Sequence, residues 1–194
     1  MVDQLLSWWL RRIGGAPCFQ VHGKGKTEAD WRLIHVFATH RRSLESRWPL
    51  WRGTCITWAR DVIVVGWDFA ERLVEEQARV PASREHPVEV AGGRLCDWQR
   101  RMKAGASSQC SASEVMAHEC GHTEQIRWMR DLYLPVVGSV TLFREGPHWW
   151  NYFENNASET GQFGGIVNGS VCARLMETLK PKPDVAPFNT PLLD

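Results

Sequence analysis

Residues 111–131 constrain the fold of this chain most, because they locate both the start of a helix and a pair of metal-binding side chains. Ser111 and Glu114 match a capping box, in which each side chain hydrogen-bonds a backbone N–H at the start of a helix. The pattern predicts a helix from about residue 111 to about Asp131. Within it, His118 and His122 stand one turn apart on the same face, so both imidazoles can bind one ion.

The residues around these histidines favour a zinc site over the alternative, a helix with two surface histidines. Zinc accepts imidazole nitrogens at about 2.0–2.1 Å, and catalytic sites keep one further position for water. Glu119 is adjacent to the first histidine and can lean toward that water without binding the metal. Cys120 points away from both histidines and is interpreted as a small buried hydrophobe. Gly121 costs a helix interior about 1 kcal/mol relative to alanine, which indicates a compensating close contact.

Two histidines do not complete a zinc site, so a third protein ligand is required. In the C-terminal half, residues 147–158 show a helical pattern with aromatic and small residues along one stripe. Glu154 lies beside that stripe, and Ser158 lies one turn further on. His148, in the same segment, is another metal-ligating side chain that could contribute to the site.

The two segments together resemble a known family. The motif His118-Glu119-x-x-His122, followed by Glu154-Asn-Asn-Ala-Ser158 on a second helix, resembles the gluzincin group of zincin metallopeptidases. The longer string from His118 to Gln125, followed by Tyr133-Leu-Pro, is similar to small bacterial zincin-like proteins. The resemblance extends loosely over residues 53–165, and only the two helices are specific.

The resemblance implies roles for individual residues. His118, His122 and Glu154 would bind Zn2+, and Glu119 would be the general base. The residue one turn after the glutamate ligand would orient a ligand histidine. Here that residue is Ser158, where the family usually has an acid, so Glu124 and Asp131 are alternatives for this role. A histidine or tyrosine would stabilise the oxyanion, and the two candidates in this chain are His148 and Tyr133.

Apolar spacing and turn residues predict the remaining elements. We expect helices at residues 1–13, 28–47 and 68–79, with Asp68 as the N-cap of the last, and two short strands or one hairpin at residues 53–58 and 61–66. We expect irregular structure at residues 83–108, a helix stop and turn at residues 161–165, and a proline-rich tail at residues 181–194. The resemblance implies that residues 56–65 provide the strand edge along which an extended peptide would lie.

These elements predict an α+β protein. Residues 1–180 would form a single zincin-like domain, with a small N-terminal β-sheet, the HExxH helix and a mainly helical C-terminal part. A chain of 194 residues is long enough to bury the core of one such domain. The implied function is a zinc metallopeptidase, a hydrolase acting on a peptide or protein substrate. The alternative is a non-catalytic zinc-binding protein with a structural, assembly or membrane-surface role.

Composition narrows the partners and the compartment. A net charge of +1, with basic and acidic residues interspersed, gives no electrostatic footprint for nucleic acid. No apolar run is long enough to span a bilayer, although the amphipathic helix at residues 1–13 could contact a membrane surface if it does not pack on the core. The six cysteines include no Cys-x-x-Cys pair, so we expect a reduced, cytoplasmic protein. The sequence does not predict the oligomeric state.

Overall fold

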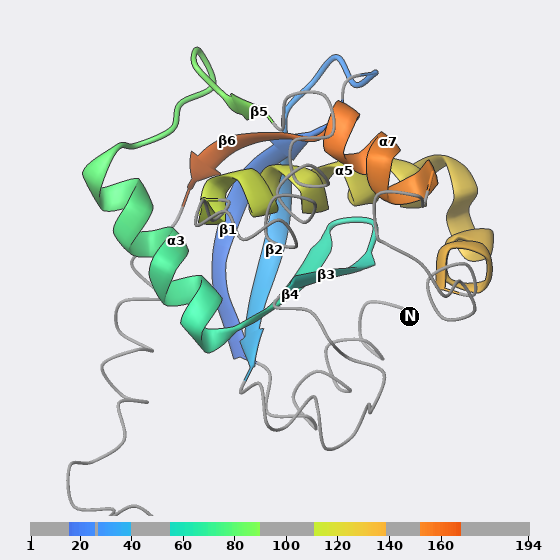
Figure 1. The fold of residues 1–194 in the computed structure, drawn as a ribbon, viewed down its shortest axis with the longest axis horizontal. Coiled ribbons are helices and arrows are strands. Elements are labelled where there is room, and N and C mark those ends of the chain that lie inside the picture. Colours follow the sequence, from blue (N-terminus) through green and yellow to red (C-terminus); the bar gives the residue numbers. More distant parts are fainter. Residues whose placement is uncertain (1–15, 26, 40–54, 90–110, 139–151, 168–194) are drawn as a thin grey trace, which may run out of the picture.

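The computed structural model describes residues 16–25, 27–39, 55–89, 111–138 and 152–167 (Figure 1). Its strands are β1 (Ala16–Lys24), β2 (Arg32–Thr39), β3 (Cys55–Ala59), β4 (Val62–Gly66), β5 (Val88–Glu89) and β6 (Gln162–Ile166). Its helices are α3 (Trp67–Arg79), α5 (Ala112–Met129) and α7 (Tyr152–Thr160), with a 3-10 turn, η2 (Arg130–Leu132), and a π-helical turn, η3 (Leu134–Gly138), after α5.

The strands form one mixed sheet in the order β3-β4-β2-β1-β6-β5. Strands β2 and β4 are parallel, and every other neighbouring pair is antiparallel. In β2, Ile34, Val36 and Ala38 are buried while Leu33 and His35 are exposed, which is the alternation of a strand with one covered face. Because β3 is the first strand in this order, it lies at an edge of the sheet in the described part of the chain, and one of its sides pairs with β4.

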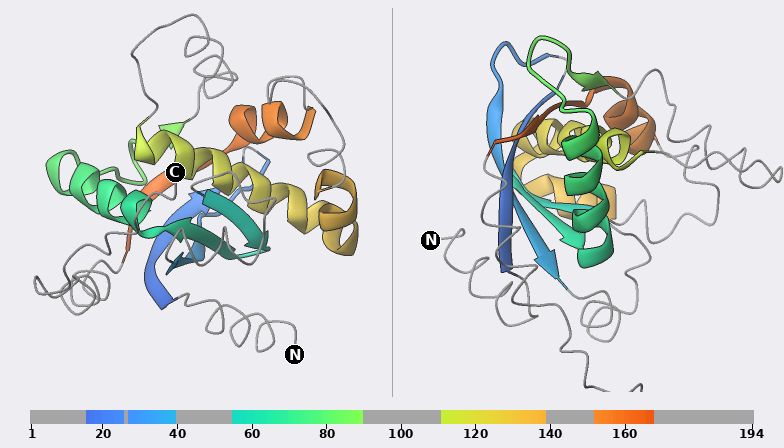
Figure 2. Two further views of the ribbon diagram at one scale, coloured as in Figure 1. Left: turned by 60° about the horizontal axis from the view of Figure 1, so that its bottom comes forward. Right: turned by 90° about the vertical axis from the view of Figure 1, so that its left-hand side faces the viewer.

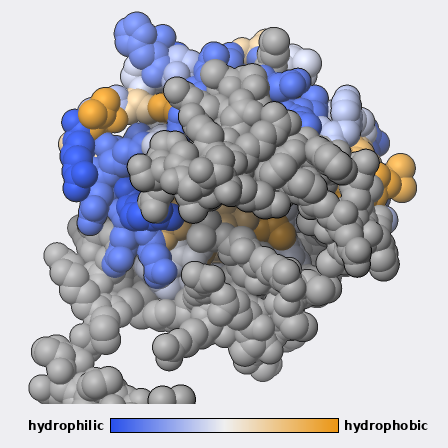
Figure 3. All heavy atoms as spheres, in the orientation of Figure 1, coloured by the Kyte–Doolittle hydropathy of each residue, from blue (hydrophilic) through white to orange (hydrophobic). Residues whose placement is uncertain are grey.

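Helix α5 covers the inner face of the sheet, and α3 packs beside it (Figures 1 and 2). The core lies between these helices and the sheet, and includes Val21, Ile34, Ile63, Phe69, Leu73, Met116, Cys120 and Phe163. The opposite side of α3 carries exposed charged residues, so this part of the surface is hydrophilic (Figure 3). The core thus fixes α5 against the sheet along most of its length.

Several predicted elements are confirmed. The strand pair before α3 is a hairpin made of β3 and β4, and α3 itself ends at Arg79 as expected. Its N-cap is Gly66, not Asp68, and no side chain caps the helix. Asp68 lies instead in the first turn, where its charge still interacts favourably with the helix dipole.

The helix predicted at residues 28–47 is wrong where the structure describes it, because residues 32–39 form strand β2. This run is almost continuously apolar, so it matches helical spacing as well as strand alternation, and only burial of one face distinguishes them. Residues 161–165 were expected to be a helix stop and turn: helix α7 does end at Thr160, but Gln162–Ile166 form strand β6 and not a turn. Residues 83–108 were expected to be irregular but include the short strand β5.

The structure is α+β, as predicted, but the sheet is larger than the small N-terminal sheet expected from the sequence. Among the described residues it has six strands, and β6, from the C-terminal part, lies between β1 and β5. The C-terminal part is consequently not only helical. The predicted N-terminal helix at residues 1–13, the tail at residues 181–194 and the outer boundary of the domain at residue 180 lie outside the described residues.

The cysteines follow the prediction only in part. Cys55 and Cys120 are free thiols, and burial is the main cause that raises the pKa of each. Cys18 is disulfide-bonded, so the expectation of fully reduced cysteines is wrong at that position. Spacing along the sequence could not show it, because pairing depends on which cysteines the fold brings together. Among the described helices, none combines the length and the apolar character needed to cross a membrane.

Candidate metal centre

Helix α5 begins where the capping box predicted. The Ser111 hydroxyl accepts a hydrogen bond from the Glu114 backbone N–H at 3.0 Å, and the Glu114 carboxylate accepts from the Ser111 N–H at 3.0 Å. The middle of the helix is buried on every side, including polar residues. A buried polar group is costly unless it is hydrogen-bonded or binds a metal, so each such side chain in α5 requires a partner.

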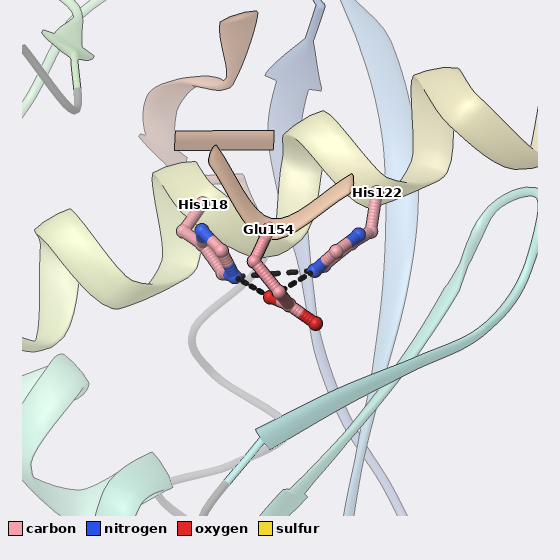
Figure 4. Close-up of side chains that lie close together, drawn as sticks. All are labelled: His118, His122 and Glu154. Carbon is pink, nitrogen blue, oxygen red and sulfur yellow. Dashed lines mark hydrogen bonds and ion pairs between the residues drawn. The ribbon is translucent and has the colours of Figure 1, made fainter. Parts of the chain in front are cut away.

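The three predicted ligands come together in space. His118 Nε2 and His122 Nε2 each lie 3.1 Å from Glu154 Oε2, and the two nitrogens lie 3.1 Å from each other (Figure 4). The histidines project from α5 and the glutamate projects from α7 (Figure 4). All three residues are buried.

This triangle of atoms fits one metal ion. Ligand atoms of a tetrahedral zinc ion with bonds of about 2.0–2.1 Å are about 3.3–3.4 Å apart. The observed separations of 3.1 Å are only slightly shorter. His118, His122 and Glu154 would therefore hold such an ion through these three atoms.

Close helix packing holds α7 in place. A Cβ atom added to Gly121 would lie 2.7 Å from the Cα and 2.8 Å from the carbonyl carbon of Ala157, so the backbones of α5 and α7 approach too closely for a side chain. This is the compensating contact that the glycine in mid-helix indicated. The approach brings Glu154, one turn before Ala157, over the two histidines of α5.

Further hydrogen bonds orient the histidines. Ser158 Oγ lies 2.8 Å from His118 Nδ1, so Ser158 contacts one of the two histidines, as expected from its position one turn after Glu154. Of the two alternatives for this role, Glu124 accepts hydrogen bonds from Thr27, and Asp131 is exposed. His122 Nδ1 lies 3.0 Å from Gln125 Oε1. The role of Gln125 was missed, although its position three residues after His122 places it one turn along the same helix face.

Glu154 and His122 each shift the pKa of the other. Burial alone would raise the pKa of Glu154, but the charge of His122 and the hydrogen bonds from His118 and His122 hold that pKa well below its usual range. Burial alone would lower the pKa of His122, but the charge of Glu154 and its hydrogen bond outweigh burial and raise it to about 9. In the metal-free protein, these two shifts favour an ionised Glu154 carboxylate beside a protonated His122 imidazolium.

Glu119, the predicted base, is held by the edge strand. The Thr57 hydroxyl on β3 donates a hydrogen bond to Glu119 Oε2 at 2.7 Å, and both residues are buried. The charge of Glu119 also contributes to the raised pKa of His122, so this carboxylate lies within electrostatic reach of the ligands. The sequence carries no signal for the contact between Thr57 and Glu119, because this contact depends on how β3 packs on α5.

Of the two candidates for the oxyanion stabiliser, Tyr133 lies near the ligands. Its ring centroid is 6.2 Å from that of His122, and its side chain is buried. Burial, and then the charges of Glu119 and Glu154, raise the pKa of Tyr133 well above its usual value, so the phenol keeps its proton. His148 lies outside the described residues.

The described residues thus contain a buried His118, His122 and Glu154 group that could hold a metal ion. Around it lie a carboxylate, Glu119, which can accept a proton, and a phenol, Tyr133, which can donate a hydrogen bond. Comparisons of the chain with protein-family models, with curated proteins and with solved structures found no match.

Proposed function

We propose that this chain is a zinc-dependent metallopeptidase, with His118, His122 and Glu154 as the metal ligands. The observation that carries the proposal is the convergence of two imidazole nitrogens of α5 and one carboxylate oxygen of α7 at mutual distances of 3.1 Å, beside Glu119 on the same α5 helix. Two imidazoles and a carboxylate form the ligand set of thermolysin-type catalytic zinc sites. A zinc ion held by these residues supplies a Lewis acid that polarises a carbonyl and acidifies water.

Glu119 has the position and the chemistry of a general base. Its carboxylate is an acceptor, and the hydrogen bond from Thr57 restricts one of its oxygens. It would take a proton from the attacking water and return it to the leaving amine, so that the net reaction is addition of one water across one peptide bond. Tyr133, which keeps its proton, would donate a hydrogen bond to the oxygen that becomes negatively charged.

The edge strand supports a peptide as the substrate. In the described part of the chain, strand β3 lies at an edge of the sheet with one side facing away from β4, and its central residue, Thr57, contacts Glu119 directly. An extended peptide added along that side would form backbone hydrogen bonds with β3. Its scissile bond would then run past Glu119, which is consistent with an enzyme that recognises the peptide backbone.

The decisive experiment separates metal binding from hydrolysis. Glu119→Gln keeps the size of the side chain and removes its basicity, so it should retain zinc and lose hydrolysis of a broad peptide library. Glu124→Gln is the matched control, because Glu124 is a buried carboxylate on the same helix that is bonded to Thr27 and not to the site. Unchanged turnover in Glu119→Gln would refute the role of the base, and wild type with zinc but without hydrolysis would favour a non-catalytic zinc protein.

Metal identity is tested in the same preparations. A ligand set of two histidines and one carboxylate also suits non-haem iron(II), so elemental analysis must distinguish the two metals. We expect stoichiometric zinc in the wild type and its loss in His118→Ala, His122→Ala and Glu154→Ala. Iron at full occupancy with no zinc would contradict the proposal, because the oxygen chemistry of such iron sites does not use a base like Glu119 to hydrolyse peptides.

A further inference from the structure

The side chain of Gln125, on α5, contacts both His122 and helix α7. Its side chain is almost completely buried, with 1% of its surface exposed. Its Oε1 atom lies 3.0 Å from His122 Nδ1. Its Nε2 atom donates to the Phe153 carbonyl at 2.7 Å and to Asn156 Oδ1 at 2.9 Å, both on α7.

These contacts define which end of the amide faces the histidine. A backbone carbonyl can only accept, so the amide nitrogen of Gln125 must face Phe153 and its oxygen must face His122. An amide oxygen is likewise only an acceptor, so His122 Nδ1 must carry a hydrogen. In the neutral imidazole, the lone pair is then on Nε2, the atom directed at Glu154 and His118.

The same side chain ties the ligands of one helix to those of the other. Phe153 and Asn156 flank Glu154 in the sequence of α7, and one hydrogen of the Gln125 amide is bonded to each of them. A shift of α7 along α5 would break these bonds together with the approach of Glu154 to the histidines. Gln125 therefore restricts the imidazole of His122 and the placement of the carboxylate ligand at the same time.

We infer that Gln125 is a positioning residue of the metal centre, which selects the Nδ1–H tautomer of His122 and fixes α7 so that Glu154 completes the site. The inference rests on the proposed function for the identity of the site. It goes further by assigning to one glutamine the hydrogen bonding that prepares a ligand from each helix. A partner of this kind that orients a ligand histidine typically changes metal affinity 10–100-fold when it is removed.

The test compares three substitutions in the full-length protein. Gln125→Met keeps the volume and removes all three hydrogen bonds, and it should weaken zinc binding about 10–100-fold. Gln125→Glu restores an acceptor for His122, and it should recover part of that loss. Gln77→Met is the control, because Gln77 donates to Ser113 near the start of α5, away from the site, and its loss should leave zinc affinity unchanged.

Nitrogen NMR of the zinc-loaded protein with labelled histidines gives a readout that a purely structural role would not change. The His122 Nδ1–H should be protected from solvent exchange in the wild type, exchange faster in Gln125→Met and be protected again in Gln125→Glu. If Gln125→Met does not fold, Asn156→Ala removes one of the two acceptors on α7, and it should weaken zinc binding less but in the same direction.

The outcomes separate this inference from the proposed function. A wild type that binds no zinc would overturn the proposed function. Equal zinc affinity in wild type and folded Gln125→Met, or an unprotected Nδ1 proton in the wild type, would overturn the role of Gln125 while the metal centre remained. An unchanged zinc affinity in Asn156→Ala would also overturn it if that variant is the one that folds.

Discussion

Replacing Gly121 with alanine tests whether the backbones of α5 and α7 pack as closely as the structure shows. Alanine is a better helix former than glycine by about 1 kcal/mol, so helix propensity alone predicts a more stable protein. The packing predicts the opposite. The added Cβ would lie 2.7 Å from the Cα of Ala157, whereas ordinary contacts begin at 3.4 Å. The obstacle is backbone, so no side-chain rotation can relieve it.

The size of the effect follows from this shortfall. The two helices must separate locally by at least about 0.7 Å to restore an ordinary contact, because the carbonyl oxygen of Ala157 lies even closer to the added Cβ than its Cα does. Overpacking of this kind costs about 1–3 kcal/mol, which cancels or exceeds the gain in helix propensity. Metal–ligand distances are held to within about 0.2 Å, so a displacement of Glu154 by several times that amount should disrupt the site. We expect stability to change by about 0 to −2 kcal/mol and zinc affinity to fall at least about tenfold.

Two measurements on Gly121→Ala check this reasoning. Thermal unfolding of the metal-free protein reports the packing, and competition with a chromogenic chelator reports zinc affinity. Adding Ala157→Gly should not restore zinc binding, because the clash is with the backbone of residue 157 and not with its methyl group. A variant that is about 1 kcal/mol more stable and binds zinc as tightly as the wild type would refute the close approach of α5 and α7.

Four other predictions concern the charges and hydrogen bonds of the site. Glu154→Gln should abolish stoichiometric zinc and lower the pKa of His122 from about 9, measured by NMR titration of the metal-free protein. The pKa of His122 is higher in the folded protein than the unfolded value of 6.5, so protonated His122 stabilises the metal-free fold. This stabilisation should be complete below pH 6.5 and should be lost as the pH rises through about 9. Thermal unfolding of the metal-free protein across this pH range measures it. For the same reason zinc binding at pH 7 should release about one proton, and calorimetry in two buffers of different ionisation enthalpy would contradict this if the heats agreed. Thr57→Val should lower peptide turnover roughly tenfold at unchanged zinc content, since Glu119 would lose the bond that orients it, and equal turnover would rule out that role.

The sequence predicted the parts of this protein whose causes are local. The capping box of Ser111 and Glu114 and the four-residue spacing of His118 and His122 need only the geometry of one helix, and α5 forms as expected. Strand β2 was predicted as a helix because its apolar residues fit both periodicities. Residues 32–39 form a strand because they pair with two other segments of the chain, β1 and β4. Helix α5 also covers one face of the sheet that these strands form.

The residues of the candidate metal centre were predicted more completely than the residues that contact them. Glu154 could be located because a motif on a second helix accompanies the first one. Gln125 and Thr57 could not, although both are visible in the sequence, because their roles are defined by what α7 and β3 place beside α5. Contacts between distant segments carry no periodic signal, so polar residues that act through such contacts become recognisable only once the fold is known.

The polar interior of α5 is itself an argument for function. A helix buried on all sides would gain stability from apolar residues there, and replacing buried charged groups with apolar ones of similar size is often stabilising. Instead, the middle of α5 keeps His118, Glu119, His122 and Gln125 buried, each with a polar neighbour contributed by another element. Three of these neighbours belong to α7, and the fourth belongs to the edge strand β3. Such an arrangement adds little to stability, but it brings together two imidazoles and a carboxylate that could hold a metal ion, with a second carboxylate, Glu119, nearby, which are the groups that the proposed hydrolysis would need.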